Sequence, residues 1–148
     1  ENGLINILNP APAWELSRDF FELVDYFTPN ETEAEFYTGV KINNENNAKE
    51  SAKKLIKMGI KNVIITLGDK GLFYSNGKND IYIKANKVKA IDTTGAGDAF
   101  NGAFSLALLR GKTIKECLEF SNTVAGLSTS KLGAGDSMPT LEEINLKV

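Results

Sequence analysis

The sequence predicts an α/β protein in which a doubly wound, mostly parallel sheet carries an antiparallel hairpin at one edge. Apolar and β-branched runs alternate with helical patterns along the chain, as strands and helices do in α/β folds. An Asn-Gly turn signal separates two β-rich runs, which indicates the hairpin. A glycine-rich turn then leads from a strand pattern into a helical one, as at the ligand-binding edge of such sheets.

The first 60 residues predict a βαβ unit followed by two further helices. Residues 4–8 and 24–30 have strand patterns, and a helical pattern at 16–24 lies between them. A second helix is predicted from Asn30. A third runs from the asparagine cluster to Gly59, which is placed to end it.

The middle of the chain predicts the remaining strands. The β-branched run at 62–68 predicts a buried strand. Residues 71–75 and 80–85 predict the two arms of the hairpin, with its turn at 76–79. Another strand is predicted at 87–91, directly before the glycine-rich turn.

Helices are predicted over the rest of the chain. Two helical patterns follow at 98–111 and 113–129. Thr113 is followed three residues later by Glu116, a capping box that begins the second of them. The same spacing at Thr140 begins a C-terminal helix.

The composition fits one globular domain covering residues 1–148. With 42% hydrophobic residues, the chain has enough apolar side chains for a core. Its formal net charge is −2, and no basic run is interleaved with aromatic residues, so no nucleic-acid partner is expected. No apolar run has the length of a membrane span and no signal peptide precedes the first strand. We therefore expect no membrane partner and a cytoplasmic location.

The residue inventory restricts the possible chemistry. The chain has no histidine and a single cysteine, Cys117. The lack of histidine removes the commonest general base and the commonest zinc ligand. Cys117 lies in a helical pattern, which predicts a buried small side chain rather than a reactive thiol. Any catalysis must therefore use carboxylates, backbone dipoles and cations.

The stretch DTTGAGDAFNGAF at residues 92–104 carries the main functional signal. Gly95 and Gly97 allow the backbone to approach an anion closely, and the helix N-terminus behind them offers unpaired N–H groups. The dinucleotide fingerprint is absent because Phe100 replaces its third glycine, and the P-loop is absent because Ala103 follows the second glycine. The turn is therefore predicted to bind phosphate by a different motif.

Asp98 lies within this phosphate turn, where its charge would repel a bound anion. One interpretation is that Asp98 accepts a proton from a hydroxyl that attacks phosphorus, since phosphoryl transfer needs mainly positioning, charge neutralisation and an ordinary base. The other is that Asp98 only caps the helix, where aspartate is favoured. The chemistry alone leaves both open.

Five stretches together resemble the ribokinase-like, or PfkB, carbohydrate kinases. They are NPAPA at 9–13, TPNETEAE at 28–35, TLGDKG at 66–71, the phosphate turn at 92–104 and KLGAGDSMPT at 131–140. They occur in the family's order, and they match the C-terminal part of its chains. The resemblance implies that a small β-sheet lid and most sugar-binding residues lie upstream, so the sequence looks like the nucleotide-binding and catalytic part.

The resemblance implies specific roles in the phosphate turn. Asp98 would be the base that activates the primary hydroxyl of the sugar. Gly95, Ala96 and Gly97 would form the anion hole for the transferring phosphate, and Gly97 would also contact the nucleotide.

Further nucleotide contacts are implied elsewhere in the chain. Thr66, Gly68 and Gly71 of TLGDKG would contact ATP, and Asn122 would line the adenine pocket. Without the resemblance, TLGDKG is better explained as a simple connection between a strand and the hairpin. Asn122 alone is explained as a polar residue on a helix face.

Two cation sites are implied. Asn30 and Glu33 would lie near the phosphates and help to hold Mg²⁺ through water, while their spacing also predicts a helix capping box. Asp92 and Thr94 would hold K⁺, an oxygen-only site that suits a hard cation; the alternative is that Asp92 caps or braces the turn. A later loop would complete the potassium site with Ser128, Lys131 through its carbonyl, Gly133 and Ser137.

The expected activity is that of a sugar kinase that transfers the γ-phosphate of ATP, bound with Mg²⁺, to the primary hydroxyl of D-ribose. The alternatives are another kinase of this family, such as a fructokinase or nucleoside kinase, and a nucleotide-binding module without transfer activity. The intact Gly-Ala-Gly-Asp turn is an argument against the second alternative. Residues 1–148 alone are expected to be inactive, and the lid is where a homodimer would form.

Overall fold

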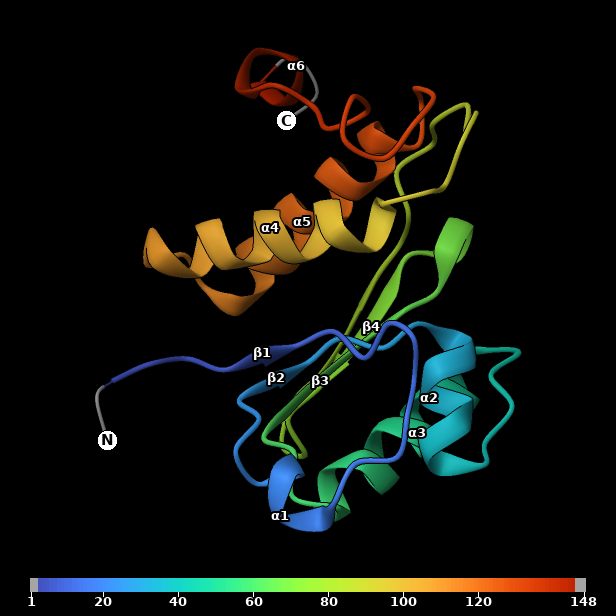
Figure 1. Ribbon diagram of the computed structural model, residues 1–148, viewed down its shortest axis with the longest axis vertical. Helices are drawn as coiled ribbons and strands as arrows, with labels where there is room; N and C mark the ends of the chain where they lie inside the picture. The colour runs from blue at the N-terminus through green and yellow to red at the C-terminus, as the bar shows by residue number, and fades with distance from the viewer. Residues whose placement is uncertain (1–2, 146–148) are drawn as a thin grey trace. The chain divides into compact units, whose positions relative to one another are not determined.

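A computed structural model describes residues 3–145, which divide into two compact units (Figure 1). The first unit contains the chain up to Gly68 together with Leu72–Tyr82. The second contains Asp69–Gly71 and the chain from Ile83 onward. The expectation of a single domain over residues 1–148 stays a prediction.

A mixed sheet forms the centre of the first unit. Within the described residues it has five strands in the order β1-β2-β3-β4-β5. The first three strands are parallel to one another, and β4 runs antiparallel to β3. The α/β fold class is therefore confirmed. The strands are β1 (Ile7–Leu8), β2 (Tyr26–Phe27), β3 (Asn62–Thr66), β4 (Leu72–Ser75) and β5 (Asp80–Ile83).

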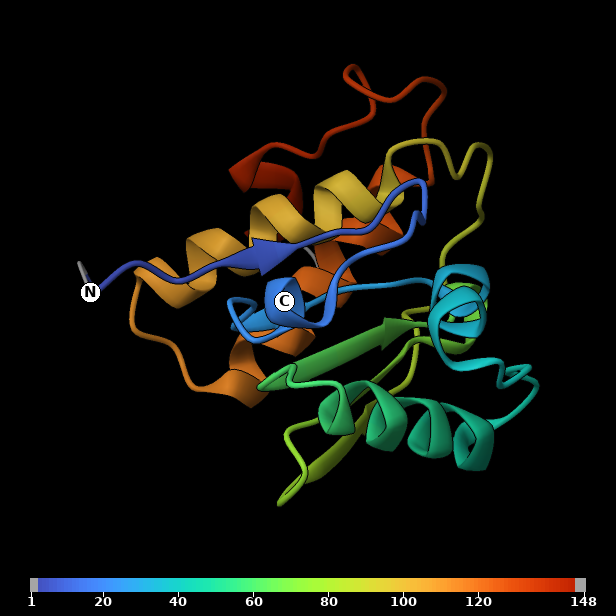
Figure 2. The same cartoon turned by 60° about the horizontal axis from the view of Figure 1, so that its bottom comes forward.

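Three helices connect the parallel strands: α1 (Arg18–Phe21), α2 (Glu31–Thr38) and α3 (Glu45–Lys57). Both α2 and α3 contact β3, and α3 also contacts β4. Figure 2 shows α3 lying alongside β3. The apolar face of α3 buries Ala48, Ala52 and Leu55 in a core shared with Phe27 and Val63. This core holds the carboxyl ends of β2 and β3 in place, and the first candidate site residues lie at these ends.

Two elements of the first unit are shorter than predicted. The helix expected at 16–24 is regular only over Arg18–Phe21, because the amides of Leu23 and Val24 bond to carbonyls three residues earlier and tighten its end. The strand expected at 4–8 pairs only at Ile7–Leu8, since the side chains before it are exposed.

Helices make up most of the second unit: α4 (Ala96–Leu109), α5 (Ile114–Ser128) and α6 (Leu141–Asn145). The longest two, α4 and α5, pack against each other (Figure 2). The capping boxes predicted at Thr113 and Thr140 are both present. Cys117 is fully buried, and burial raises the pKa of its thiol, as expected for an unreactive cysteine.

The strand predicted at 87–91 is wrong. No strand of the described residues pairs with this segment, and Ile91 is 59% exposed. The backbone amides of Ile91 and Asp92 donate instead to the carbonyl of Thr129, at 2.7 and 3.1 Å. The segment before the phosphate turn is thus held by the end of α5 and not by a sheet.

None of the helices within residues 3–145 combines the length and the apolar character that a bilayer crossing requires.

Candidate functional site

The predicted site residues fall in both units. Asn30, Glu33, Thr66 and Gly68 belong to the first, and all the others belong to the second.

The phosphate turn enters α4 at Gly95, which is the N-cap of this helix and has a φ of 77°. This left-handed conformation favours glycine. A Cβ atom at Gly95 would lie 3.1 Å from the Cβ of Ala134 and 3.2 Å from its Cα. The backbone conformation therefore favours glycine here, and a larger residue would also have to displace Ala134 by a few tenths of an ångström.

The first turn of α4 leaves backbone donors available. The Ala96 amide donates to the Thr93 carbonyl at 3.2 Å, and the Ala99 amide donates to Gly95 at 2.9 Å. Between them, the amides of Gly97 and Asp98 have no acceptor within the described part of the chain. These two amides, at the N-terminus of a 14-residue helix, can bind an anion through hydrogen bonds and the helix dipole.

The Asp98 side chain is exposed in this first turn and makes no hydrogen bond to the described residues. The N-cap of α4 is Gly95, which makes no side-chain cap. Asp98 therefore does not cap α4 by hydrogen bonding, although its charge still interacts favourably with the helix dipole. An accessible carboxylate beside two unpaired amides can accept a proton from a ligand bound there.

Asp92 braces the turn with both carboxylate oxygens. Its Oδ1 accepts the amide of Thr94 at 2.9 Å, and its Oδ2 accepts the amide of Gly133 at 3.0 Å. Hydrogen bonds from the Thr94 side chain and amide, and then from the Gly133 amide, lower the pKa of Asp92. Asp92 is thus ionised and joins the phosphate turn to a loop 41 residues later.

Three of the predicted potassium ligands, Asp92, Thr94 and Gly133, are brought together by these bonds. The other side chains of the set have partners of their own. The hydroxyls of Ser128 and Ser137 donate to carbonyls three residues earlier, at 2.8 and 2.9 Å. The ammonium of Lys131 pairs with Glu143 at 2.6 Å.

Asn30 and Glu33 form a complete capping box at the start of α2. The Asn30 side chain accepts the Glu33 amide at 2.9 Å, and Glu33 Oε2 accepts the Asn30 amide at 2.8 Å. Glu33 is only 8% exposed, and burial raises the pKa of its carboxyl. Asn30 also forms a parallel bridge with Thr66. The structure therefore brings Asn30, Glu33 and Thr66 together at the carboxyl ends of β2 and β3.

The two glycines of TLGDKG have different surroundings. At Gly68 φ is 54° and a Cβ would meet nothing within 4 Å, so the space beside it is open. At Gly71 φ is 109° and a Cβ would lie 1.9 Å from the carbonyl oxygen of Ile83. Gly71 is therefore explained by the close approach of two backbone segments.

Asn122 holds the segment that follows β5. Its Nδ2 donates to the Lys84 carbonyl at 2.9 Å, and the neighbouring Thr123 hydroxyl accepts Asn86 Nδ2 at 2.8 Å. The side chain therefore has a structural partner, and one face of its amide oxygen remains for a ligand.

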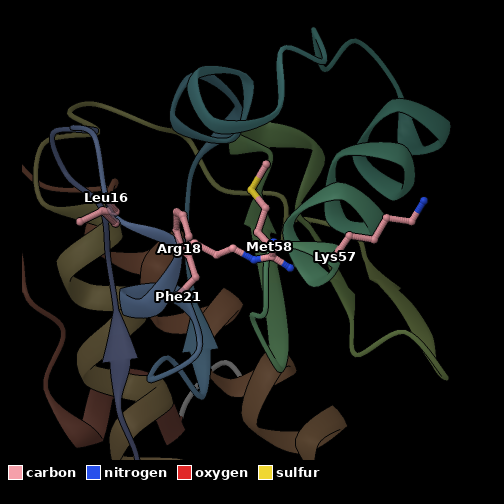
Figure 3. A pocket seen from close by; sticks show the side chains of 5 residues that line it. All are labelled: Leu16, Arg18, Phe21, Lys57 and Met58. Atoms are coloured by element: carbon pink, nitrogen blue, oxygen red, sulfur yellow. The ribbon is translucent and has the colours of Figure 1, made fainter.

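A pocket of about 310 Å³ lies elsewhere in the first unit, between α1 and the end of α3 (Figure 3). Its lining contains none of the predicted site residues. The lining side chains are Leu16, Arg18, Phe21, Lys57 and Met58.

Sequence reasoning missed two residues of the phosphate turn's surroundings, Thr129 and Ala134. Thr129 contributes only its carbonyl, which no side-chain pattern reveals. Ala134 lies in the second copy of the tetrapeptide Gly-Ala-Gly-Asp, at residues 133–136. That repetition was visible, but only the structure shows that one copy packs on the other.

Comparison with known proteins explains this arrangement. The profile of the pfkB family carbohydrate kinases matches residues 1–141. The chain belongs to this family. The ribokinase of Haemophilus influenzae is 47% identical over 143 residues, which are 97% of this chain and 47% of the relative. The ribokinase of Staphylococcus aureus is 42% identical over 145 residues, 97% and 48% of the two chains.

Solved structures of pfkB-type kinases have the same fold. Ribokinase from Thermotoga maritima superposes with a TM-score of 0.88 at 41% identity, covering 99% of this chain and 49% of its own. Arabidopsis thaliana ribokinase, complexed with ribose and ATP, gives a TM-score of 0.89 at 31% identity over 97% and 47% of the two chains. This pfkB chain thus spans about half the length of the relatives it matches.

Proposed function

We propose that this chain carries the nucleotide-binding and catalytic part of a ribokinase, which transfers the γ-phosphate of ATP to the primary hydroxyl of D-ribose and yields ribose 5-phosphate and ADP. The observation that carries the proposal is the start of α4, where the unpaired amides of Gly97 and Asp98 lie beside the accessible Asp98 carboxylate. The ribokinases of two bacteria at 42% and 47% identity support the choice of sugar.

The mechanism follows from the turn. The sugar hydroxyl attacks the γ-phosphorus, the bond from phosphorus to the bridging oxygen of ADP breaks, and the hydroxyl proton passes to the Asp98 carboxylate. The amides of Gly97 and Asp98 donate to the phosphoryl oxygens as charge builds on them. Gly95 sets the direction of these amides. Because the transition state is loose, positioning and charge stabilisation supply most of the catalysis.

Asn30 and Glu33 would help to hold Mg²⁺ in this proposal. Amide and carboxylate oxygens are donors that Mg²⁺ accepts, and a cation nearby would favour ionisation of Glu33. One oxygen of Glu33 remains for water after the capping bond. The ion would neutralise phosphate charge when bound. Thr66, at the end of the adjoining strand, and Gly68, with open space beside it, would contact the nucleotide.

K⁺ would be held beside the phosphate turn by Asp92 and Thr94, and the site would be completed by Ser128, the Lys131 carbonyl, Gly133 and Ser137. Carboxylate, hydroxyl and carbonyl oxygens suit a hard monovalent cation. Asp92 accepts one amide on each oxygen and also the Thr94 hydroxyl, so one lone pair of the carboxylate remains for a cation. Asn122 would border the adenine with its bond to the Lys84 carbonyl intact, and Gly71 would serve the nucleotide only indirectly, by allowing two backbone segments to pack closely.

We further propose that the intact protein is cytoplasmic and dimerises through a lid outside this chain. Residues 1–148 alone would not phosphorylate ribose, since a lid normally completes such a site and excludes water. Other family activities, such as fructokinase or nucleoside kinase, remain the alternatives within the same chemistry. A nucleotide-binding module would bind ATP without sugar-dependent turnover.

The test is a coupled ATPase assay of the intact protein with a panel of sugars and nucleosides. Ribose should give the highest kcat/KM. Asp98→Asn should lower kcat by about 100-fold or more, the scale of a lost general base, while the Kd for ATP is retained.

Asp136→Asn is the matched control. Asp136 ends the second Gly-Ala-Gly-Asp tetrapeptide and is exposed, but it does not lie in a helix. The Asp136→Asn variant should keep the kcat of the wild type. Equal losses in the two variants, or full activity in Asp98→Asn, would contradict the role of Asp98, and no turnover with any sugar would favour the nucleotide-binding module.

A further inference from the structure

The phosphate turn has little packing of its own. Among the described residues no strand leads directly into it, and Ile91, Thr93 and Thr94 are exposed. Its backbone is bonded to the end of α5, where the Thr129 carbonyl accepts the amides of Ile91 and Asp92. The position of the turn therefore depends on the end of α5 and on the loop that leaves it.

The loop after α5 makes two further contacts to the turn. The Gly133 amide donates to Asp92 Oδ2 at 3.0 Å. The next residue, Ala134, places its Cα and Cβ against the face of Gly95 where a side chain would stand, at 3.2 and 3.1 Å from that point. The methyl group of Ala134 thus limits how far Gly95 can move toward the loop.

Ala134 is exposed, but its backbone is anchored to a buried residue. Its carbonyl accepts the hydroxyl of Ser137 at 2.9 Å, and Ser137 is fully buried. Met138 packs against the core between α4 and α5. On the other side of the loop, Lys131 is paired with Glu143 of α6 at 2.6 Å. The loop is therefore anchored at Ser137 and Met138, whereas Gly133, Ala134 and Gly135 themselves are exposed.

We propose that Ala134 is a positioning residue for the phosphate turn, and that its small side chain is required to hold Gly95 in place. The inference rests on the proposed function of that turn. Gly97 and Asp98 lie two and three residues after Gly95, in the first turn of α4, so a shift of Gly95 moves the two unpaired amides and the carboxylate together. Misplacement of a catalytic group by about 1 Å can cost about 100-fold in rate.

Two substitutions test the contact from opposite directions. Ala134→Val places a methyl group toward Gly95 in two of its three rotamers and pushes the turn away. Ala134→Gly removes the methyl group and releases the turn. Ala134→Ser keeps nearly the volume of alanine and should behave as the wild type.

Gly135→Ala is the control, because it adds a methyl group at the next position of the loop. A Cβ there would meet nothing within 4 Å, and the φ of Gly135 is not positive.

Two measurements on the intact protein separate positioning from stability. In steady-state kinetics with ribose, Ala134→Val should lower kcat by tenfold to 100-fold with the KM for ATP nearly unchanged, the pattern of a transition-state defect. In hydrogen–deuterium exchange, the peptides covering 91–98 and 129–134 should exchange faster in the Val and Gly variants. In these two variants, all other peptides should exchange at the wild-type rate. The Ala134→Ser and Gly135→Ala variants should match the wild type in both kcat and exchange.

The possible outcomes are distinct. Wild-type kcat and wild-type exchange in Ala134→Val would overturn the proposal, as would equal defects in Gly135→Ala, which would show general intolerance of the loop. If the wild-type protein itself shows no sugar-dependent turnover, the proposed kinase function fails. Hydrogen–deuterium exchange is then the only test of the role of Ala134. Faster exchange confined to the peptides 91–98 and 129–134 of the Val and Gly variants would still support the positioning role.

Discussion

Gly71→Ala should be among the most destabilising single substitutions in this chain. The φ of 109° at Gly71 lies where alanine is strained, at a cost of about 1–3 kcal/mol. The new Cβ would also lie 1.9 Å from the Ile83 carbonyl oxygen and 2.6 Å from the Ala85 amide nitrogen. Ordinary C···O contacts begin near 3.3 Å, so the two backbones must separate by more than about 1 Å.

That separation would break the bonds that hold the segment after β5. The Ala85 amide donates to the Lys70 carbonyl at 3.4 Å, and Asn122 donates to the Lys84 carbonyl at 2.9 Å. Each such bond contributes about 1 kcal/mol. Together with the backbone strain, we expect the free energy of unfolding to fall by about 3–5 kcal/mol.

The assay is urea unfolding of the intact protein, followed by circular dichroism, with Gly111→Ala as the control. Gly111 has a φ of 68° and open space around a Cβ, so its variant should lose only about 1–2 kcal/mol. Equal shifts in the two variants would refute the reasoning from close approach. A Gly71→Ala protein of normal stability but weakened ATP binding would show instead that Gly71 serves the nucleotide directly.

Three further predictions concern a network, a cap and a cation. The Asn6 amide and the Lys61 ammonium lower the pKa of Asp25 in the folded protein. The stability that the Asp25 carboxylate contributes is therefore present above pH 3.8 and is lost as the pH falls through the pKa of the folded state. Asp25→Asn should lower the free energy of unfolding by about 1 kcal/mol at pH 7, and the free energies of the variant and the wild type should converge in acid. Thr113→Ala removes the capping box of α5 and should cost about 1 kcal/mol in urea unfolding. K⁺ should activate the intact enzyme, and Asp92→Ala should abolish that activation; a flat potassium titration in sodium-free buffer, with ionic strength held by a bulky inert cation, would contradict the site.

Local signals in the sequence predicted most of the fold. The capping boxes at Asn30, Thr113 and Thr140 begin helices as expected, because each requires only residues within one turn. The strand at 87–91 failed because a strand needs a neighbour. Its apolar residues resembled a buried strand, but pairing is a property of the whole sheet, and within residues 3–145 this segment has no partner.

The candidate site was predictable where backbone geometry follows from residue type. Glycines and an aspartate before an apolar helix predict a helix N-terminus with unpaired amides, and the structure has them at Gly97 and Asp98. The support for the turn was not predictable. It uses the Thr129 carbonyl and the Ala134 methyl group, which have no distinctive chemistry and lie more than 30 residues downstream.

Glycines in a family motif are informative only together with the atoms that a side chain would meet there. Gly68, Gly71 and Gly95 all have positive φ, so sequence and backbone conformation alone would assign them one common role. The space at Gly68 is open, the space at Gly71 is filled by another backbone segment, and the space at Gly95 is filled by Ala134. Only Gly68 leaves room for a ligand at its own position, whereas Gly71 and Gly95 act by allowing the chain to pack on itself. The direct nucleotide contact in TLGDKG is therefore best sought at Gly68, and loss of ATP affinity in a Gly71 variant is expected to follow from loss of structure.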